Sequence, residues 1–289
     1  MTAKFLDGKK VANLQLAATK IGVEAFLERA HRPPGLAVVL VGCDPASQIY
    51  VANKRQACKD IDIKSCAYDL DATTSEATLL KLIQELNEAS DIDGILVQLP
   101  LPAHINETAI IEAINPKKDV DGFHPYNAGR LLQANPMLRP CTPKGIIDLL
   151  AHYDVPIKSK HAVVVGASNI VGRPMAMELL MQGATVTICH SKTDDLKAHV
   201  MMADILVVAV GIKDLISPDW IKPTAAVIDV GIHRLENGKL RGDLDFDALK
   251  SKVAYLTPVP GGVGPMTIAS LMANTLMAAN IFCLSKMQF

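Results

Sequence analysis

A short segment near the start of the chain combines an aromatic ring, an amine and a hydroxyl at helical spacing. Residues 47–54 read Ser-Gln-Ile-Tyr-Val-Ala-Asn-Lys and follow an apolar run, Leu36–Val41, that is typical of a buried strand. Pro45 suits the first turn of a helix, where a missing N–H costs nothing. Tyr50 and Lys54 then lie one turn apart on one face. A buried amine there could act as a charge or as a base. The alternative is a solvated lysine whose stem covers a surface tyrosine.

A second polar side chain is expected at the same edge of the sheet. Residues Gly94–Leu99 predict another strand, and Gln98 stands near its end. Ligands of parallel α/β sheets bind beyond the carboxyl ends of the strands. Gln98 could therefore face the same crevice as Lys54. Alternatively, its amide closes the end of the strand by bonding to backbone.

Two acidic residues follow in a polar loop dense in turn formers. Asp119 and Asp121 stand two apart within Asn115–Pro125. Each could be a turn residue that bonds its own backbone, so this signal is weak by itself. No third ligand stands at a fixed spacing, so we expect no metal here.

A glycine turn between a strand and a helix is a further chemical signal. Residues Ala162–Val165 predict a buried strand, and a helix over Met175–Gln182 follows a turn that begins at Gly166. Gly166 permits the tight turn, and the N-terminus of the helix offers N–H groups to a pyrophosphate. Ser168 replaces the middle glycine of the usual dinucleotide fingerprint, so an ordinary tight turn remains the alternative.

The end of the next predicted strand, Ala184–Cys189, indicates which dinucleotide is bound. NAD-binding folds carry an acid there that holds the ribose 2′-hydroxyl. This chain instead reads His-Ser-Lys-Thr over residues 190–193. A carboxylate would repel a 2′-phosphate, whereas Ser191, Lys192 and Arg173 could hold one. We therefore predict NADP rather than NAD.

Two later segments could approach a flat ligand. Predicted strands over Asp204–Val210 and Ala226–Val230 are each followed by a glycine, Gly211 and Gly231, and Ile232 lies just past the second. Its backbone N–H could meet a nicotinamide amide, although it could equally be a plain core residue. The last strand, Val253–Thr257, leads into residues 258–265, where three glycines and three prolines permit neither a helix nor a central strand.

The elements that must position these residues alternate between strand and helix, which predicts right-handed crossovers and parallel sheets. Asp7 can cap a first helix, and Thr73–Glu76 reads as a capping box for another. Thr142 and Pro143 would cap and begin a helix at a domain boundary. The inward face of the first helix is predicted to comprise Val11, Leu14, Ala18, Ile21 and Ala25.

Composition excludes several classes of protein. Hydrophobic residues make up 49% of the 289 residues, charged residues 20%, and the net charge is −1, so the chain is globular. Scattered basic residues argue against a nucleic-acid or membrane-surface partner. The start has no apolar core of signal-peptide length, and the six cysteines show no paired spacing, so we expect a cytoplasmic protein with reduced thiols. Polar residues within Met266–Leu284 favour a buried helix over a membrane span.

Taken together and in order, six blocks resemble the bifunctional methylenetetrahydrofolate dehydrogenase/cyclohydrolase family. The resemblance covers nearly the whole chain, and the ordered set is far more specific than any one block. The blocks are Tyr50–Lys54, Asp93–Pro102, Lys118–Gly122, Pro140–Pro143, Gly166–Pro174 and Pro258–Thr267.

The resemblance implies two α/β domains with parallel sheets flanking a cleft that holds the folate, the second a Rossmann-type NADP-binding domain, in a homodimer. Residues 1–139 would form the folate-binding catalytic domain, completed by a C-terminal helix, 266–289, that packs back on it. Residues 140–265 would form the NADP-binding domain. The implied role is one-carbon metabolism.

The resemblance also implies roles for particular residues. Lys54 looks like the family's catalytic lysine, Tyr50 like the aromatic that lines the pterin, and Gln98 like the glutamine bonded to that lysine. Asp121 looks like the carboxylate that grips the pterin's amino group and ring nitrogen. The substrate contacts would be completed by Val97, Leu99, Pro260, Gly261, Gly262, Val263 and Gly264. The cofactor contacts would be Gly166, Ala167, Ser168, Arg173, Ser191 and Ile232. Some members carry Arg in place of Ala167, where it serves the 2′-phosphate, so the phosphate ligands here stay open.

The implied chemistry is hydride removal from the methylene between N5 and N10 of the folate, then addition of water to the cationic carbon. The first step needs mainly positioning. In the second, Lys54 would take and return the proton, which it can do only if burial and the cationic substrate favour the neutral amine. The alternatives are a dehydrogenase-only member, a short-chain dehydrogenase suggested by Tyr50 and Lys54, and a non-enzymatic NADP sensor. In a short-chain dehydrogenase the pair would follow the nucleotide turn in the same domain, whereas here it precedes Gly166.

Overall fold

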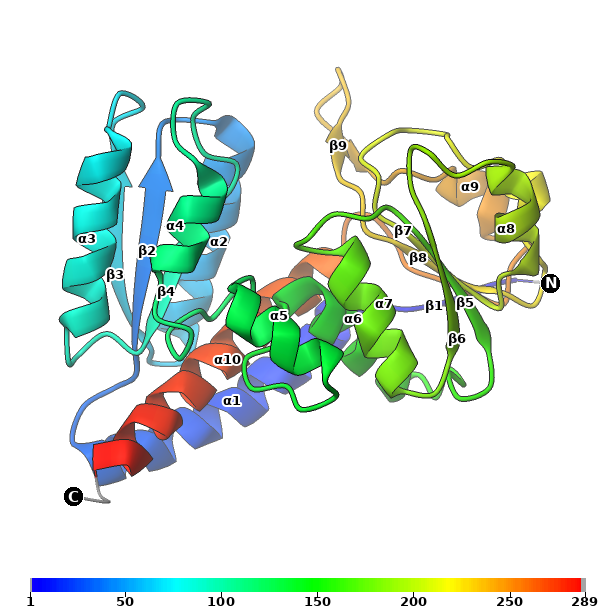
Figure 1. Ribbon diagram of the computed structural model, residues 1–289. Helices are drawn as coiled ribbons and strands as arrows, with labels where there is room; N and C mark the ends of the chain where they lie inside the picture. Colours follow the sequence, from blue (N-terminus) through cyan, green and yellow to red (C-terminus); the bar gives the residue numbers. More distant parts are fainter. Residues whose placement is uncertain (1, 287–289) are drawn as a thin grey trace. The chain divides into compact units, whose positions relative to one another are not determined.

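The computed structural model describes residues 2–286, with side-chain surroundings for residues 2–281 (Figure 1). The chain divides into two compact units. One unit comprises residues 13–141 and the helix segment from residue 268 onward, and we call it the three-stranded unit. The other comprises the residues up to 12 together with 142–267, and we call it the six-stranded unit.

The three-stranded unit is built on a parallel sheet of order β3-β2-β4. Its strands are β2 (Gly35–Val41), β3 (Lys64–Leu70) and β4 (Gly94–Val97). Every residue of β2 is buried, as expected of a central parallel strand covered on both faces. The helices of this unit are α2 (Pro45–Asp60), α3 (Glu76–Glu88), α4 (Glu107–Ala113) and α5 (Pro125–Leu132).

Alternate residues of β2 serve two separate cores, because successive side chains of a strand point to opposite faces. Val39 packs with apolar residues of α3 and α4, such as Ile83 and Ile110. Val38 packs instead with Val51 of α2 and Leu271. Figure 1 shows α3 and α2 on opposite sides of the sheet. This arrangement leaves the carboxyl ends of β2 and β4 for the polar side chains described below.

Two long helices, α1 (Gly8–Ala30) and α10 (Val263–Lys286), lie side by side where they belong to the three-stranded unit (Figure 1). Val23 of α1 packs in the same core as Leu271 and Met272 of α10. The predicted inward face of α1 is wrong at four of its five residues: Leu14 is 54% exposed, Ile21 is 68% exposed, and Ala18 and Ala25 are exposed as well, so only Val11 is buried. The helix carries apolar residues on more than one face. Packing against α10 buries the face that includes Val23, not the predicted one.

The six-stranded unit has a parallel sheet of order β1-β11-β8-β7-β5-β6. Its strands are β1 (Lys4–Phe5), β5 (His161–Val165), β6 (Thr185–Cys189), β7 (Ile205–Val208), β8 (Ala226–Asp229) and β11 (Tyr255–Leu256). An antiparallel hairpin of β9 (His233–Arg234) and β10 (Leu240–Arg241) follows β8.

Helices cover both faces of this second sheet, which is the doubly wound arrangement. They are α6 (Cys141–His152), α7 (Gly172–Met181), α8 (Leu196–Met202) and α9 (Phe246–Leu249), with a 3₁₀ turn over Pro218–Trp220. Figure 1 shows α7 on one side of β5 and β6 and α8 on the other. The predicted fold class, α/β with parallel sheets and a Rossmann-type second half, is confirmed.

Local caps differ from the predicted ones in two places. Ser75, not Thr73, caps α3 by accepting from Thr78 N at 3.2 Å, while Glu76 accepts from Asn106 N across to the next helix. Helix α6 begins at Cys141, so Thr142 lies inside it instead of capping it, and its hydroxyl contacts Thr267 Oγ1 at 2.9 Å. Asp7 bonds Lys10 N at 3.0 Å at the start of α1, as predicted.

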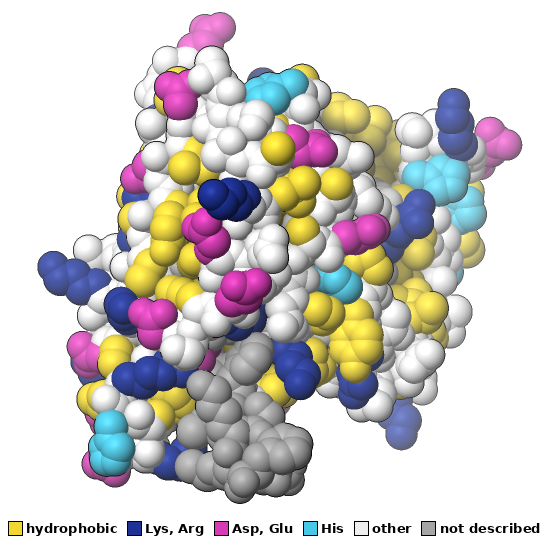
Figure 2. Space-filling view, turned by 60° about the vertical axis from the view of Figure 1, so that its left-hand side comes forward, with side chains coloured by type: hydrophobic (Ala, Val, Ile, Leu, Met, Phe, Trp, Pro, Cys, Tyr) yellow, Lys and Arg dark blue, Asp and Glu magenta, His cyan; other side chains and the backbone are white. Residues whose placement is uncertain are grey.

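Charged side chains of both signs are intermixed with apolar patches on the face of the molecule in Figure 2. Within residues 2–286, no helix is both long and apolar enough to cross a membrane.

Candidate active site and nucleotide-binding turn

Lys54 lies on helix α2, which follows the carboxyl end of β2 in the three-stranded sheet. The Asp44 carboxylate caps this helix by accepting from Ser47 N at 2.8 Å, and Pro45 occupies its first turn, as predicted. Lys54 is only 6% exposed. A lysine is seldom so deeply buried unless its amine has a specific partner.

Gln98 is that partner. Its Oε1 accepts from Lys54 Nζ at 3.0 Å, and its Nε2 donates to Leu99 O. Its backbone N–H donates to Val39 O and continues the ladder past the end of β4. The amide is therefore held on both sides, which fixes its oxygen toward the amine. The Leu99–Pro100 peptide that follows is cis.

Tyr50 lies one turn before Lys54 on the same helix. Its side chain is half-buried, and burial raises the pKa of its phenol. The hydroxyl therefore stays protonated at neutral pH and presents a neutral aromatic surface. Ser47, a turn earlier, is buried.

Asp121 follows a loop that a second carboxylate organises. Asp119 is buried and accepts from the backbone of Gly122, Phe123 and His124 at 2.8 to 3.2 Å. Asn127 Nδ2 donates to Asp119 at 2.8 Å. Desolvation raises the pKa of Asp119 in spite of these bonds. Asp119 is thus the structural carboxylate of the pair.

Asp121 is partly exposed, and its electrostatic environment links it to the lysine. Desolvation raises its pKa to about 6, against the opposing pull of the Lys54 charge, and the nearby Asp119 charge adds to the rise. The structure therefore brings Lys54, Gln98 and Asp121 together at one end of the three-stranded sheet, with Tyr50 on the same helix as the lysine.

The described residues contain no group of His, Cys, Asp or Glu that could hold a metal. The five cysteines among the described residues form no disulfide, and Cys58, Cys141 and Cys189 are buried. Cys283 lies outside the residues whose side chains are described.

The turn between β5 and α7 in the six-stranded unit has a shape that only glycine allows. Gly166 has φ +121°, and an added Cβ would lie 2.3 Å from Ala209 O. A Cβ on Gly172 would lie 2.0 Å from Gly166 O. The Ser168 hydroxyl accepts from Val171 N at 3.1 Å and Gly172 N at 3.3 Å. Two of the N–H groups expected to face a pyrophosphate are therefore already bonded, and the hydroxyl proton of Ser168 is left to donate.

Arg173 and the end of β6 supply the remaining groups for a dinucleotide. Arg173 is exposed, and its Nε donates to Ala167 O at 3.1 Å. Ser191 and Lys192 are exposed beyond β6, in a turn closed by Thr193 N donating to His190 O. No carboxylate stands between Cys189 and Thr193. A glycine cradle followed by hydroxyls and cations fits NADP.

Two further predicted ligand segments belong to the same unit. Ile232 is 44% exposed just beyond β8, so it is not a core residue. The loop before α10 contains a cis Val259–Pro260 peptide and Gly261 at φ +104°. Gly261 O accepts from Lys9 N at 3.0 Å, which ties this loop to the start of α1.

Sequence reasoning missed a pair of buried carboxylates at the carboxyl ends of β7 and β8. Asp229 ends β8, and Asp243 follows β10. Asp229 directly follows the apolar run of a buried strand, which was the available signal. Nothing local marked Asp243, because its partners are contributed by other segments of the chain.

A buried lysine–amide pair in one α/β unit and a dinucleotide cradle in another define a nucleotide-dependent oxidoreductase of two α/β domains. Comparison with known proteins specifies the family. The catalytic-domain model of the tetrahydrofolate dehydrogenase/cyclohydrolase family matches residues 6–121, and its NAD(P)-binding-domain model matches residues 140–282. The chain belongs to this family.

Close relatives cover almost the full length. The chain is 58% identical to the bifunctional protein FolD of Legionella pneumophila strain Corby, over 96% of this chain and 98% of the relative. The crystal structure of FolD from Campylobacter jejuni is 48% identical with a TM-score of 0.93, covering 96% of this chain and 99% of that one. The Trypanosoma brucei enzyme, solved with NADP cofactor and an inhibitor, is 37% identical with a TM-score of 0.93, covering 97% and 98%.

These matches confirm the family inferred from the six sequence blocks. The chain is a bifunctional enzyme, a methylenetetrahydrofolate dehydrogenase and cyclohydrolase, and its cofactor is NADP. The short-chain dehydrogenase alternative is wrong, and so is the non-enzymatic sensor.

Proposed function

We propose that the chain oxidises 5,10-methylenetetrahydrofolate to 5,10-methenyltetrahydrofolate with NADP, then hydrolyses that product to 10-formyltetrahydrofolate at a site centred on Lys54. The observation that carries the proposal is the buried Lys54 amine, 3.0 Å from Gln98 Oε1. Such an amine, within the electrostatic reach of Asp121, can exchange a proton with a bound folate.

In the first step, the methylene carbon loses a hydride and the lone pairs of N5 and N10 stabilise the resulting cation. NADP supplies the hydride acceptor. The chain's own residues hold the folate: Tyr50 offers its ring to the pterin, and Asp121 accepts from the pterin amino group and ring nitrogen. This step depends on positioning more than on acid–base catalysis.

In the second step, water adds to the cationic carbon and Lys54 Nζ takes the released proton. The carbon–N5 bond then breaks as the same amine returns that proton to N5. The hydroxyl on the carbon gives up its own proton to solvent and becomes the carbonyl of the formyl group, which stays on N10. Gln98 orients the amine throughout. Its side chain is neutral, so it accepts a hydrogen bond without locking the lysine in an ion pair.

We assign further folate contacts to Val97, Leu99 and residues 260–264 on the basis of the family resemblance. The catalytic domain would comprise residues 1–139 and the helix segment 266–289, and the NADP-binding domain residues 140–265. The contacts of NADP would be Gly166, Ala167, Ser168, Arg173, Ser191 and Ile232, with Lys192 as a further candidate for the 2′-phosphate.

We also propose a cytoplasmic homodimer. Its support is the family resemblance together with exposed large apolar side chains on helices of both units, such as Ile21 and Leu180. Light scattering should then give twice the chain mass of 31.0 kDa. A mass equal to a single chain at micromolar concentration would contradict the dimer.

Replacement of Lys54 by Met tests the assignment of the amine. We expect hydrolysis of methenyl-folate, supplied alone and followed by its absorbance, to fall at least about a hundredfold, since general acid–base catalysis of this kind contributes that much. The dehydrogenase reaction should partly survive. Lys59→Met, which removes an exposed lysine from the same helix, is the matched control. Hydrolysis at the normal rate in Lys54→Met would refute the role.

A further inference from the structure

The order of strands in the six-stranded sheet indicates where each half of NADP lies. β5 is the first strand of the nucleotide fold in sequence, β6 neighbours it on one side, and β7 and then β8 lie on the other. A dinucleotide crosses such a sheet where the strand order reverses, with its adenosine ribose at the end of the second strand. The adenosine half therefore lies toward β6, and the nicotinamide half toward the ends of β7 and β8.

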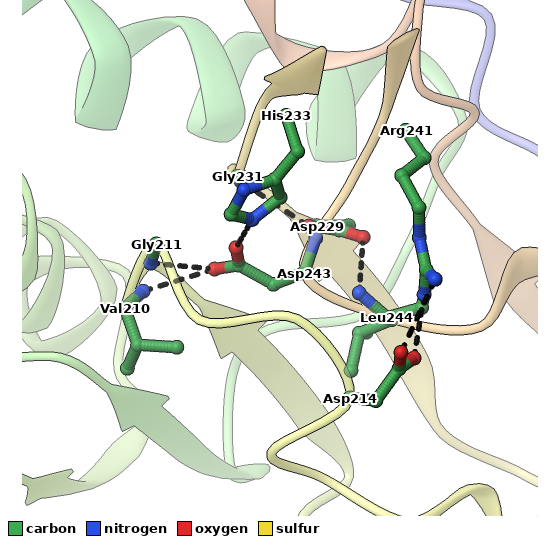
Figure 3. A network of polar contacts seen from close by, with 9 residues as sticks. All are labelled: Val210, Gly211, Asp214, Asp229, Gly231, His233, Arg241, Asp243 and Leu244. Carbon is green, nitrogen blue, oxygen red and sulfur yellow. Dashed lines mark hydrogen bonds and ion pairs between the residues drawn. The ribbon is translucent and has the colours of Figure 1, made fainter. Parts of the chain in front are cut away.

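One buried carboxylate bonds the backbone at the end of β7. Asp243 Oδ2 accepts from Val210 N and from Gly211 N, both at 3.0 Å. Its other oxygen, Oδ1, lies 2.7 Å from His233 Nε2, which donates from the hairpin that follows β8. Figure 3 shows the Asp243 side chain between these two groups of partners. Asp243 thus joins the segment after β7 to the segment after β8.

A second carboxylate holds Asp243 in place. Asp229, at the end of β8, accepts from Asp243 N at 3.0 Å, Leu244 N at 2.9 Å and Gly231 N at 3.1 Å. Two glycines make room for the pair. A Cβ on Gly231 would lie 2.1 Å from Asp243 Oδ1, and one on Gly242 would lie 1.9 Å from Asp229 Oδ2.

Both carboxylates are almost fully enclosed, with Asp229 4% exposed and Asp243 1% exposed. Burying a carboxylate costs free energy even when it is hydrogen-bonded. Apolar side chains of similar size in the same place often give a fold equal or greater stability. What the carboxylates provide and apolar groups could not is a fixed geometry for five backbone N–H groups. Two of these, at Val210 and Gly211, border the expected nicotinamide position, and Gly231 directly precedes Ile232.

We propose that Asp243 is a positioning residue for the nicotinamide half of NADP. By fixing the segments that follow β7 and β8, it sets the backbone that meets the nicotinamide, while the adenosine half binds independently of it. The inference rests on the NADP-dependent dehydrogenase activity and goes beyond the cofactor contacts assigned above, none of which includes Asp243, Asp229 or His233.

Three variants separate positioning from general stability. Asp243→Ala removes every side-chain bond of the carboxylate. Asp243→Asn keeps an oxygen for Val210 N and Gly211 N and replaces only the oxygen that faces His233. His233→Ala removes only the partner of Oδ1. Arg241→Met is the matched control, because Arg241 lies on the same hairpin but its guanidinium bonds the exposed Asp214 carboxylate and Leu244 O instead of either buried carboxylate (Figure 3).

The decisive readout compares two ligands by calorimetry. One is NADP, and the other is 2′,5′-ADP, which contains only the adenosine half. For Asp243→Ala we expect the Kd for NADP to rise about tenfold or more, the equivalent of losing a hydrogen bond to a charged group. The Kd for 2′,5′-ADP and the hydrolysis of methenyl-folate should stay within about twofold of the parent, because one lost contact leaves independent ones intact.

The other variants give graded expectations. Asp243→Asn should bind NADP within about threefold of the parent, since its bonds to Val210 N and Gly211 N are preserved. His233→Ala should weaken NADP binding by about threefold, the loss of one part-exposed contact. Arg241→Met should leave the Kd for NADP and the Kd for 2′,5′-ADP unchanged. If Asp243→Ala fails to fold, the His233→Ala result decides the proposal.

Several results would overturn the proposal. If Asp243→Ala lost equal affinity for NADP and for 2′,5′-ADP, the role of Asp243 would be merely structural. If its affinity for NADP were unchanged, Asp243 would have no role in positioning the nicotinamide. Unchanged NADP affinity in His233→Ala, where Asp243→Ala does not fold, would also refute it. A parent protein that binds 2′,5′-ADP and NADP but does not oxidise methylene-folate would instead refute the proposed reaction and leave the positioning role standing.

Discussion

A single amide explains how a lysine can be buried without an ion pair. Gln98 accepts from Lys54 Nζ, and its own nitrogen is engaged by Leu99 O, so the amide cannot turn its nitrogen toward the amine without losing both bonds. A carboxylate in this place would favour the charged amine. The neutral partner fits a group that must both take and return a proton.

Asp121 sets an expected pH dependence for folate binding. Its pKa of about 6 means that the carboxylate becomes protonated, and loses an accepting oxygen, as the pH falls through that value. We expect the Michaelis constant for folate to rise below pH 6 in the parent and to be high and independent of pH in Asp121→Asn. Steady-state assays of both reactions from pH 5 to 8 measure this. Unchanged Michaelis constants in the variant would refute the pterin contact.

The same residue should cost stability at neutral pH. An acid whose pKa is higher in the folded state than in the unfolded state favours folding when protonated, so stability is lost as the pH rises from about 4 through 6. Asp121→Asn should therefore be more stable than the parent by about 1–3 kcal/mol at pH 8. The difference should shrink as the pH falls toward 4, as urea titrations would show. If Asp121→Asn were less stable than the parent at pH 8, the expected gain in stability would be contradicted.

At the level of elements, the loop that carries Asp121 depends on helix α5. Asn127, on α5, donates to Asp119 Oδ2 and to Pro116 O, both at 2.8 Å. Removing this amide in Asn127→Ala leaves a buried carboxylate short of one donor. We expect a loss of about 2–3 kcal/mol in the free energy of unfolding, measured in urea. We also expect a higher Michaelis constant for folate, because the loop loosens.

The matched control for Asn127→Ala is Leu132→Ala, which truncates a side chain that is 68% exposed at the end of the same helix. It should change stability by about 0.5 kcal/mol at most. If Asn127→Ala destabilised the protein without altering the Michaelis constant for folate, α5 would support the fold but not the position of Asp121.

Elements with strong local signals were predictable from the sequence. The apolar runs of β2 and β5, the helix that begins at Pro45 and the glycine turn after β5 each have a cause within a few residues. The two-residue strand β1 was not predicted, because it is too short to show a period and forms only by pairing with β11. The first helix has apolar residues on more than one face, so its buried face depends on α10.

The candidate site shows the same division. Lys54 and Gln98 could be brought together from sequence, because the helix that carries Lys54 follows the carboxyl end of β2 and Gln98 follows the carboxyl end of the neighbouring parallel strand β4. The Asp243 contacts could not, because they depend on how a hairpin returns to β7. Ser168 was misjudged in one respect. Its hydroxyl accepts from two N–H groups that were expected to be free. The sequence shows that serine replaces glycine, but it does not show which groups the hydroxyl bonds.

At the scale of the whole molecule, a ligand that binds only the folded chain stabilises all of it. NADP at 100 times its Kd should raise the free energy of unfolding by about 2.7 kcal/mol. NAD at the same concentration should stabilise less, because the turn beyond β6 holds Ser191 and Lys192 and no carboxylate to bind a ribose hydroxyl. Thermal unfolding with each dinucleotide measures the difference.

Lys192→Met should remove much of that difference. We expect the variant to lose about 1–2 kcal/mol of the stabilisation by NADP, the worth of a charge-assisted hydrogen bond, and to keep the response to NAD. Lys197→Met, which removes an exposed lysine from α8, is the control and should leave both responses unchanged. If NADP stabilised Lys192→Met as much as the parent, the 2′-phosphate contact would be assigned to Arg173 instead. Its guanidinium is already oriented over the turn by the bond from Nε to Ala167 O. Arg173→Met should then show the loss that Lys192→Met did not.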